Sequence, residues 1–174
     1  MEERSFLEKS QKNFCPYGVV PSQTIFPGLV LLTACRGDGS EGVPVPPPLD
    51  VTELMRRNRS HDALAARAKF QPPANIVTRH YDQPLEQLYT TIIKSVVLTQ
   101  PHTFMHAAYD PQIQAHFVAR SRWLNFPDEI AIQVMPETTL ILWSRSIYGG
   151  DDFSVNRNRL AAWLAELDAR LSVQ

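Results

Sequence analysis

The sequence predicts an α+β fold of two layers, in which a four-stranded antiparallel sheet carries an N-terminal and a C-terminal helix on one face. Hydrophobic residues recur with the period of a helix at both ends of residues 82–171, and with the period of a strand between them. The strand-like segments are joined by short stretches in which proline lies beside aspartate or glutamate, as is typical of hairpin turns. Successive hairpins make a meander the simplest topology.

Composition divides the 174-residue chain into three parts. Residues 1–50 hold seven of the fourteen prolines, whereas residues 51–148 contain no glycine. The stretch "GDGSEGVPVPPPLD" cannot form a helix or a central strand, because proline lacks the amide donor and pushes its neighbours into extended conformations. We therefore expect a signal-like or disordered segment over 1–35, a semi-rigid linker over 36–50 and a single globular domain over 51–174.

An apolar run, "IFPGLVLLTAC", ends at Cys35 just before this linker. The run is too short to span a membrane as a helix but has the length of a signal-peptide core. Its end, Leu32-Thr33-Ala34-Cys35, resembles the lipobox of bacterial lipoproteins, in which the cysteine is lipidated and becomes the mature N-terminus. A short basic start is missing, with only Lys12 nearby. Two interpretations stay open: a lipid-anchored protein of the bacterial cell envelope, and a cytoplasmic protein with an ordinary apolar segment.

The first helix is predicted between Asp82, a candidate N-cap, and Pro101, which ends it. Pro84 is expected in the first turn. The apolar residues follow the spacing of one buried helical stripe. They are Leu85, Leu88, Tyr89, Ile92, Ile93 and Val96.

Four strands are predicted next, within residues 102–109, 114–123, 129–135 and 138–147. The second alternates most clearly and is expected to be a half-buried strand. One of its faces carries Ala115, Phe117, Ala119 and Trp123. The other carries Gln114, His116, Val118, Arg120 and Arg122.

The closing helix follows a turn that contains Gly149 and Gly150. Asp151 and Asp152 precede it, where carboxylates cap a helix and favour its dipole. At 100° per residue, one stripe contains Phe153, Asn156, Leu160, Trp163, Leu164, Leu167 and Leu171.

The segments "HFVARSRWLNFPDEIAIQVMP" and "TLILWSRSIYGGDDFSVNRNRLAAWLAEL" together resemble the bacterial and plastid family known as domain of unknown function 1499. The resemblance covers about residues 50–172. Members often carry a signal peptide, a lipid anchor or a membrane span, so the resemblance favours lipidation of Cys35. The Cys-Pro-Asn-Cys segment of many members is absent here, and the resemblance implies no activity. The motif residues are Phe126, Pro127, Asp128, Ser144, Ser146, Asp152, Phe153 and Asn156.

Asn156 lies on the apolar stripe of the closing helix and is therefore expected to be buried, where its amide needs partners. We favour a structural latch, in which Asn156 bonds the backbone of the 148–150 turn and Asp152 caps the helix. The alternative is an anion site formed by the N-terminus of the helix with Arg145 or Arg157.

A second candidate lies on the polar side of the sheet. Arg120, Arg122 and His116 share one strand face, and Arg145 lies on another strand beside Trp143. These residues predict either a cationic, partly aromatic binding surface or an ordinary solvated sheet face.

Several classes of function find no support in the sequence. A formal net charge of −1 argues against binding to nucleic acid. No metal site is expected, because a third ligand is missing near His106 and His116. No catalytic residue and no cofactor are predicted, since the chain has no nucleophile elbow and no phosphate-binding glycine loop.

The sequence therefore favours a non-enzymatic binding or scaffolding domain, tethered to the bacterial envelope by a lipid on Cys35, with an unknown protein or small-molecule partner. The alternative is a soluble enzyme or small-molecule carrier that uses the arginine-bearing sheet face. A closed pocket on that face would favour the carrier, and a flat apolar patch would favour a protein partner.

Overall fold

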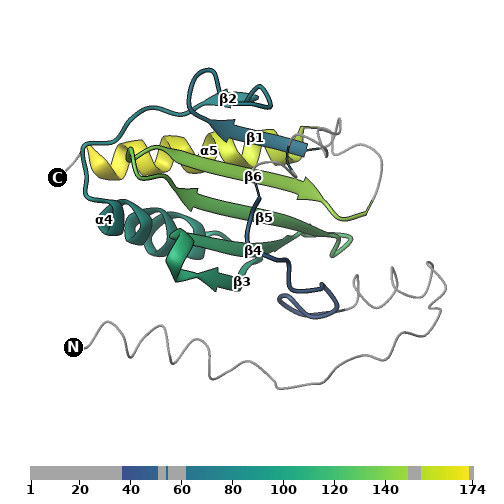
Figure 1. Ribbon diagram of the computed structural model, residues 1–174. Helices are drawn as coiled ribbons and strands as arrows, with labels where there is room; N and C mark the ends of the chain where they lie inside the picture. The colour runs from purple at the N-terminus through teal and green to yellow at the C-terminus, as the bar shows by residue number, and fades with distance from the viewer. Residues whose placement is uncertain (1–36, 51–53, 55–61, 149–153, 173–174) are drawn as a thin grey trace, which may run out of the picture.

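The computed structural model describes residues 37–50, 54, 62–148 and 154–172, which form an α+β fold around one mixed sheet (Figure 1). The strands lie in the order β2-β1-β6-β5-β4-β3. Their bounds are β1 Asp62–Ala66, β2 Ile76–Val77, β3 Thr103–Tyr109, β4 Gln114–Arg120, β5 Pro127–Val134 and β6 Leu140–Ser146. The helices are α4 Leu85–Thr90, continued by η1 Thr91–Val96 and η2 Val97–Thr99, then η3 Asp110–Gln112 and α5 Val155–Leu171.

The α+β class is confirmed, but the prediction of a four-stranded antiparallel sheet was wrong, because the sheet has six strands and is mixed. Strands β3 to β6 do form an antiparallel meander. Strand β1 adds to β6 in antiparallel orientation, and β2 pairs with β1 in parallel. Neither added strand could be recognised from the sequence. Strand β1, "DALAA", is short and rich in alanine, and β2 has two residues, which are too few to show an alternation.

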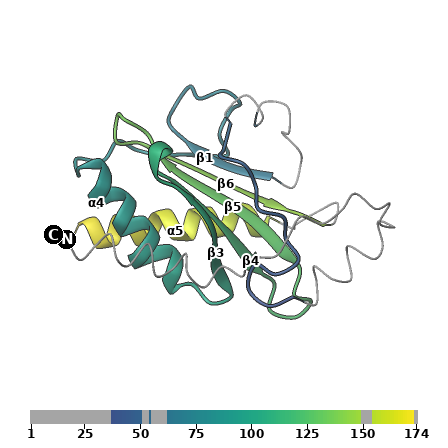
Figure 2. The same cartoon turned by 60° about the horizontal axis from the view of Figure 1, so that its bottom comes forward.

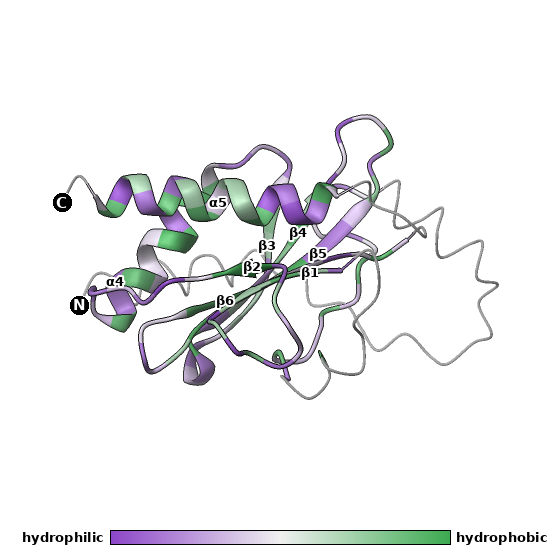
Figure 3. Ribbon diagram, turned by 90° about the horizontal axis from the view of Figure 1, so that it is seen from above, coloured by the Kyte–Doolittle hydropathy of each residue, from purple (hydrophilic) through white to green (hydrophobic). Residues whose placement is uncertain are grey.

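Both helical segments cover the same face of the sheet, as Figures 2 and 3 show. The α4 segment begins at Leu85 with Pro84 as its N-cap residue, so the prediction of Asp82 as N-cap was wrong. On α5 the described part of the predicted stripe is buried, from Asn156 to Leu171. None of the helices in the described ranges is long and apolar enough to cross a membrane.

The opposite face of the sheet is covered by residues 43–50, which we call the strap (Figure 1). The strap is extended, as its prolines predict, and lies within the segment expected to be a linker. A second apolar cluster forms on this face, where Leu49 packs beside Leu64, Ile141 and Trp143. Consequently every residue of β4 is buried, and the prediction of a half-buried strand was wrong.

Arg120 holds the residues that lead into the strap. Its Nε donates to the carbonyl oxygen of Gly39 at 2.6 Å and its Nη2 to that of Glu41 at 2.7 Å. Its Nη1 donates to the carbonyl of Asn125 in the β4–β5 turn at 3.0 Å. One buried guanidinium therefore joins the N-terminal turn (residues 37–42) to the sheet.

Three other side chains of β3 and β4 bind the strap backbone. Gln114 Oε1 accepts the Leu49 N–H at 2.5 Å, and His106 Nε2 donates to the carbonyl of Pro44 at 3.0 Å. The Tyr109 hydroxyl donates to the carbonyl of Pro46. An extended proline segment has no internal hydrogen bonds, so these side chains supply partners that the strap cannot provide for itself.

Replacing Arg120 with methionine should lower the free energy of unfolding by about 3 kcal/mol, since three carbonyl groups lose a charged donor. Urea denaturation followed by circular dichroism measures the loss. The matched control is Arg122→Met in the exposed β4–β5 turn, which should stay within about 0.5 kcal/mol of the natural chain. Equal effects of the two substitutions would contradict the role given to Arg120.

Candidate functional site

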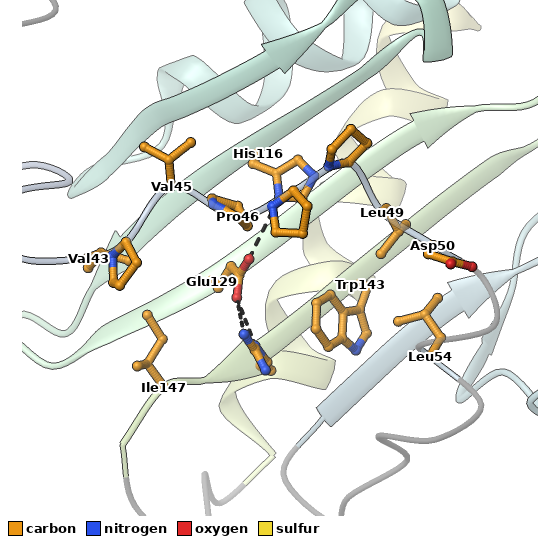
Figure 4. A pocket seen from close by; sticks show the side chains of 14 residues that line it. Val43, Val45, Pro46, Leu49, Asp50, Leu54, His116, Glu129, Trp143 and Ile147 are labelled. Carbon is orange, nitrogen blue, oxygen red and sulfur yellow. Dashed lines mark hydrogen bonds and ion pairs between the residues drawn. The ribbon is translucent and has the colours of Figure 1, made fainter. Parts of the chain in front are cut away.

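A cleft of about 700 Å³ lies between the strap and the sheet (Figure 4). Its walls come from the strap on one side and from β4, β5 and β6 on the other. Most of the lining is apolar, while Glu129 and Arg145 bring charge from the sheet and Asp50 brings it from the strap. The lining residues are Val43, Pro44, Val45, Pro46, Pro47, Pro48, Leu49, Asp50, Leu54, His116, Glu129, Trp143, Arg145 and Ile147.

Three charged or titratable side chains meet on the sheet surface of this cleft. Glu129 of β5 lies opposite Arg145 of β6 in the strand register and diagonally across from His116 of β4. Arg145 donates from Nη2 and Nε to Glu129 Oε2, at 2.5 and 2.8 Å. The His116 Nδ1 lies 3.7 Å from Glu129 Oε1, and a dashed line marks this contact in Figure 4. The carboxylate therefore bridges two basic groups.

The surroundings of Glu129 decide its charge. Burial by itself would raise the pKa of this carboxyl group, because its side chain is only 6% exposed. The contacts with His116 and Arg145 act in the opposite direction and outweigh burial, so the pKa of Glu129 lies below its ordinary value. Glu129 is therefore ionised in the folded protein at neutral pH.

The position of one proton on His116 follows from its neighbours. Its Nε2 lies 2.9 Å from Gln114 Oε1, an oxygen that can only accept hydrogen bonds, so Nε2 carries a proton. The same oxygen accepts the amide of Leu49 in the strap. The Tyr109 ring meets the imidazole edge-on, with 5.5 Å between centroids. His116 is thus connected both to the strap and to Glu129.

Arg145 gives the cleft a cation that can still bind a ligand. In the described part of the chain its hydrogen bonds both go to Glu129, through Nε and Nη2, which leaves Nη1 available as a donor. Its guanidinium carbon lies 5.0 Å from the ring centroid of Trp143, a cation–π distance. An apolar wall with a partly exposed arginine can hold a molecule that has an apolar body and an anionic group.

A separate polar network lies on the helix side of the sheet. Asn156 of α5 accepts a hydrogen bond from Ser144 Oγ at 2.6 Å and donates to Ser146 Oγ at 3.2 Å. Arg159 donates to Asn156 Oδ1 at 2.5 Å, to Ser144 Oγ at 2.9 Å and to Asp128 Oδ2 at 2.6 Å. Ser146 Oγ donates to Asp128 Oδ1 at 2.8 Å and so completes the network. It fastens the first turn of α5 to β5 and β6.

This network bears on the two interpretations of Asn156. Asn156 is fully buried and links α5 to β6. Its predicted bonds to the 148–150 turn and the predicted cap by Asp152 involve Gly149, Gly150 and Asp152, which lie outside the described residues. Arg145 lies on the opposite side of the sheet, with Glu129, and Arg157 is exposed on α5. Of the two arginines proposed as alternatives for the anion site, Arg145 thus faces the strap, whereas Arg157 lies near the N-terminus of α5.

The remaining predicted residues lie apart from the cleft surface formed by His116 and Arg145. Arg120 is on the same sheet face but binds the N-terminal turn, and Arg122 stacks on Trp123 in the β4–β5 turn. Phe126 is exposed at the end of that turn, and the buried Pro127 begins β5. Cys35, Asp152 and Phe153 lie outside the described residues.

Glu129 and Gln114 were not predicted as members of the site, whereas Trp143 was expected beside Arg145. All three occupy alternate positions that face the strap side of the sheet. A signal existed for Glu129, because it is a charged residue at the start of a largely apolar strand and Arg145 follows on the next strand. The strap could be recognised only as extended chain, since proline spacing does not say which surface it covers.

The histidines do not form a metal site in the described part of the chain, which contains no group of three or more His, Cys, Asp or Glu side chains suited to a metal. His116 pairs with Ala107, because the register shifts between Met105 and Ala107. His106 lies at this bulge and turns its Nε2 to the strap.

A family model described as "Protein of unknown function (DUF1499)" matches residues 47–167. This range includes the network around Asn156, the charged cluster of the cleft and the second half of the strap. No curated protein and no solved structure matches the chain.

The lowered pKa of Glu129 predicts how a Glu129→Gln variant responds to pH. The ionised carboxylate stabilises the fold above the unfolded value of about 4.3, and this contribution is lost as the pH falls through the lower folded pKa. The variant should therefore be least stable, relative to the natural chain, at neutral pH. Urea denaturation at decreasing pH should show the difference shrinking below about pH 4.3.

Glu137→Gln, in the exposed turn before β6, is the control for this experiment. Its deficit should stay within about 0.5 kcal/mol. A Glu129→Gln deficit that is unchanged from neutral to acid pH would refute the charge assigned to Glu129.

Proposed function

The chain belongs to the DUF1499 family of proteins of unknown function, and from this basis we propose that it is a non-enzymatic binding domain whose ligand occupies the cleft beneath the strap. The observation that carries the proposal is the cleft itself, about 700 Å³ on the arginine-bearing sheet face. This volume lies within the range of small-molecule sites, which are mostly apolar with a few polar groups that fix orientation.

The lining supports an amphipathic ligand with a single anionic group. Trp143, Leu54 and Ile147 offer apolar surface, and Arg145 offers the donor for a carboxylate, sulfonate or phosphate. Because Glu129 neutralises part of the charge of Arg145, a ligand with several negative charges fits the site less well. Strap prolines complete the wall without presenting amide donors that would need partners.

The polar groups of the cleft support binding better than catalysis. His116 is 1% exposed, its Nε2 is bonded to Gln114 and its Nδ1 lies 3.7 Å from Glu129, so little of its ring is open to a substrate atom. Among the described residues, the cleft lining contains no serine, threonine or cysteine nucleophile. A carrier that holds its ligand without converting it agrees with this chemistry.

We also propose that the domain is tethered to the bacterial envelope through a lipid on Cys35. The lipobox-like Leu32-Thr33-Ala34-Cys35 supports the tether, as do the anchors common in the family. Cys35 precedes Gly37, the first described residue, by two positions, so little chain would separate the lipid from the domain.

Anilinonaphthalene sulfonate, which has apolar rings and one anionic group, tests the cleft. The natural chain should bind one molecule with enhanced fluorescence. Arg145→Met should raise the dissociation constant about tenfold, because the sulfonate loses a charged donor. Ile147→Trp should abolish binding by filling the cleft, while Arg122→Met, outside the cleft, should bind like the natural chain.

Thermal unfolding of each variant shows whether the fold is kept. Binding that withstands both Arg145→Met and Ile147→Trp would place the dye elsewhere and refute the cleft as the ligand site.

Metabolic labelling with a palmitate analogue tests the tether. In a bacterial host the natural chain should be labelled and should fractionate with membranes, whereas Cys35→Ser should lose the label. Cys15→Ser, at the other cysteine of the chain, is the matched control and should keep the label. A soluble, unlabelled product with residues 1–34 intact would refute the lipid anchor.

A further inference from the structure

The turn between β4 and β5, residues 121–126, presents large apolar side chains to solvent. Trp123 is 85% exposed and Leu124 is 64% exposed, and Phe126 is also exposed. Single exposed apolar residues are ordinary on protein surfaces, but here three of them occur within four consecutive positions. Neither the cleft nor the network around Asn156 uses these side chains.

The turn is held in one conformation by its own hydrogen bonds. Ser121 N–H donates to the Phe126 carbonyl at 2.9 Å, Asn125 N–H donates to the Ser121 carbonyl at 3.0 Å, and Ser121 Oγ accepts the Phe126 N–H at 2.9 Å. Asn125 has φ of 55°, and its carbonyl is held by Arg120. The exposed side chains are thus presented by a preorganised turn, which lowers the entropic cost of binding through them.

The chemistry of the turn suits the interfacial region of a bilayer. Tryptophan favours the boundary between headgroups and acyl chains, where its ring is apolar and its N–H meets water. Arg122 lies over the Trp123 ring, 5.1 Å from guanidinium carbon to centroid, and its long side chain can reach headgroup level while its stem stays in apolar surroundings.

The neighbouring charges make apolar contact the main driving force. Asn125 Nδ2 donates to the Gly37 carbonyl at 3.0 Å, which joins the turn to the N-terminal turn (residues 37–42). That segment carries Asp38 and Glu41, both exposed. Their negative charges offset Arg122, so the surface offers no net attraction to anionic lipid.

We propose that residues 121–126 form a membrane-contact turn that inserts Trp123 and Leu124 into the interfacial region of a lipid bilayer. A protruding turn with three apolar side chains is too small for a stable protein interface, which buries about 800 Å² on each partner. A bilayer needs no complementary shape. The turn is also bonded to Gly37, two residues after Cys35, so a lipid on Cys35 would lie at the same end of the domain.

The contact would bring the cleft close to the bilayer. Ile147, which lines the cleft, donates its amide to the carbonyl of Pro127, directly after the turn, at 3.3 Å. One end of the cleft therefore lies beside the membrane-contact turn. An amphipathic ligand drawn from the bilayer would have a short path to the binding site.

The experiment uses the full chain with Cys35→Ser, so that no lipid anchor contributes, and vesicles of phosphatidylcholine alone or mixed equally with phosphatidylglycerol. The chain should sediment with both kinds of vesicle, with little effect of salt. Trp123 is the exposed tryptophan, whereas Trp143 and Trp163 are buried, so a blue shift of tryptophan emission reports its insertion. Adding Trp123→Ser and Leu124→Ser should lower the partition coefficient at least about tenfold.

Val77→Ser, at an exposed apolar position on β2, is the matched control and should partition like the parent. Equal partitioning of the double variant, or no vesicle binding and no blue shift in the parent, would overturn the proposal. So would binding that requires phosphatidylglycerol and disappears in salt, or a concentration-dependent dimer that the double substitution abolishes. Dye binding in the cleft is independent of these outcomes and separates this proposal from the proposed function.

Discussion

The organisation of this protein depends on hydrogen bonds from side chains of the sheet to the backbone of the strap. An extended proline-rich chain has carbonyl groups without internal partners, and the covered sheet face supplies donors from His106 and Tyr109. Arg120 holds the N-terminal turn (residues 37–42) that leads into the strap. Gln114 accepts the one strap amide bound in this way, that of Leu49. These bonds hold the strap over the sheet while leaving a cleft beside Glu129 and Trp143.

Strand alternation places two different polar clusters back to back. On β5, Asp128 faces α5 and binds Arg159, whereas the next residue, Glu129, faces the strap and binds Arg145. On β6, Ser144 joins the Asn156 network on the helix side, while Arg145 lies on the cleft side. One cluster fastens the helix and the other lines the cleft. Adjacent residues of β5 and β6 therefore form both a structural connection and a candidate site.

The cleft, the N-terminal turn (residues 37–42) and the membrane-contact turn meet at one end of the sheet. Arg120 is the common point, because it binds carbonyl groups of both turns from the end of β4. If a lipid on Cys35 and the side chains of the membrane-contact turn reach the same bilayer, the domain is held with one end of its cleft beside the lipid. A carrier of amphipathic molecules would benefit from that orientation.

The sequence by itself determined the α+β class, the family, the meander of β3 to β6 and the buried stripe of α5, because each depends on periodicity along a continuous segment. It also placed His116 and Arg145 on polar strand faces. Only the tertiary structure decided that β1 and β2 extend the sheet, that the strap buries its second face and that Glu129 lies between His116 and Arg145. These features depend on strand register and on contacts between distant segments, which local patterns of hydrophobicity do not encode.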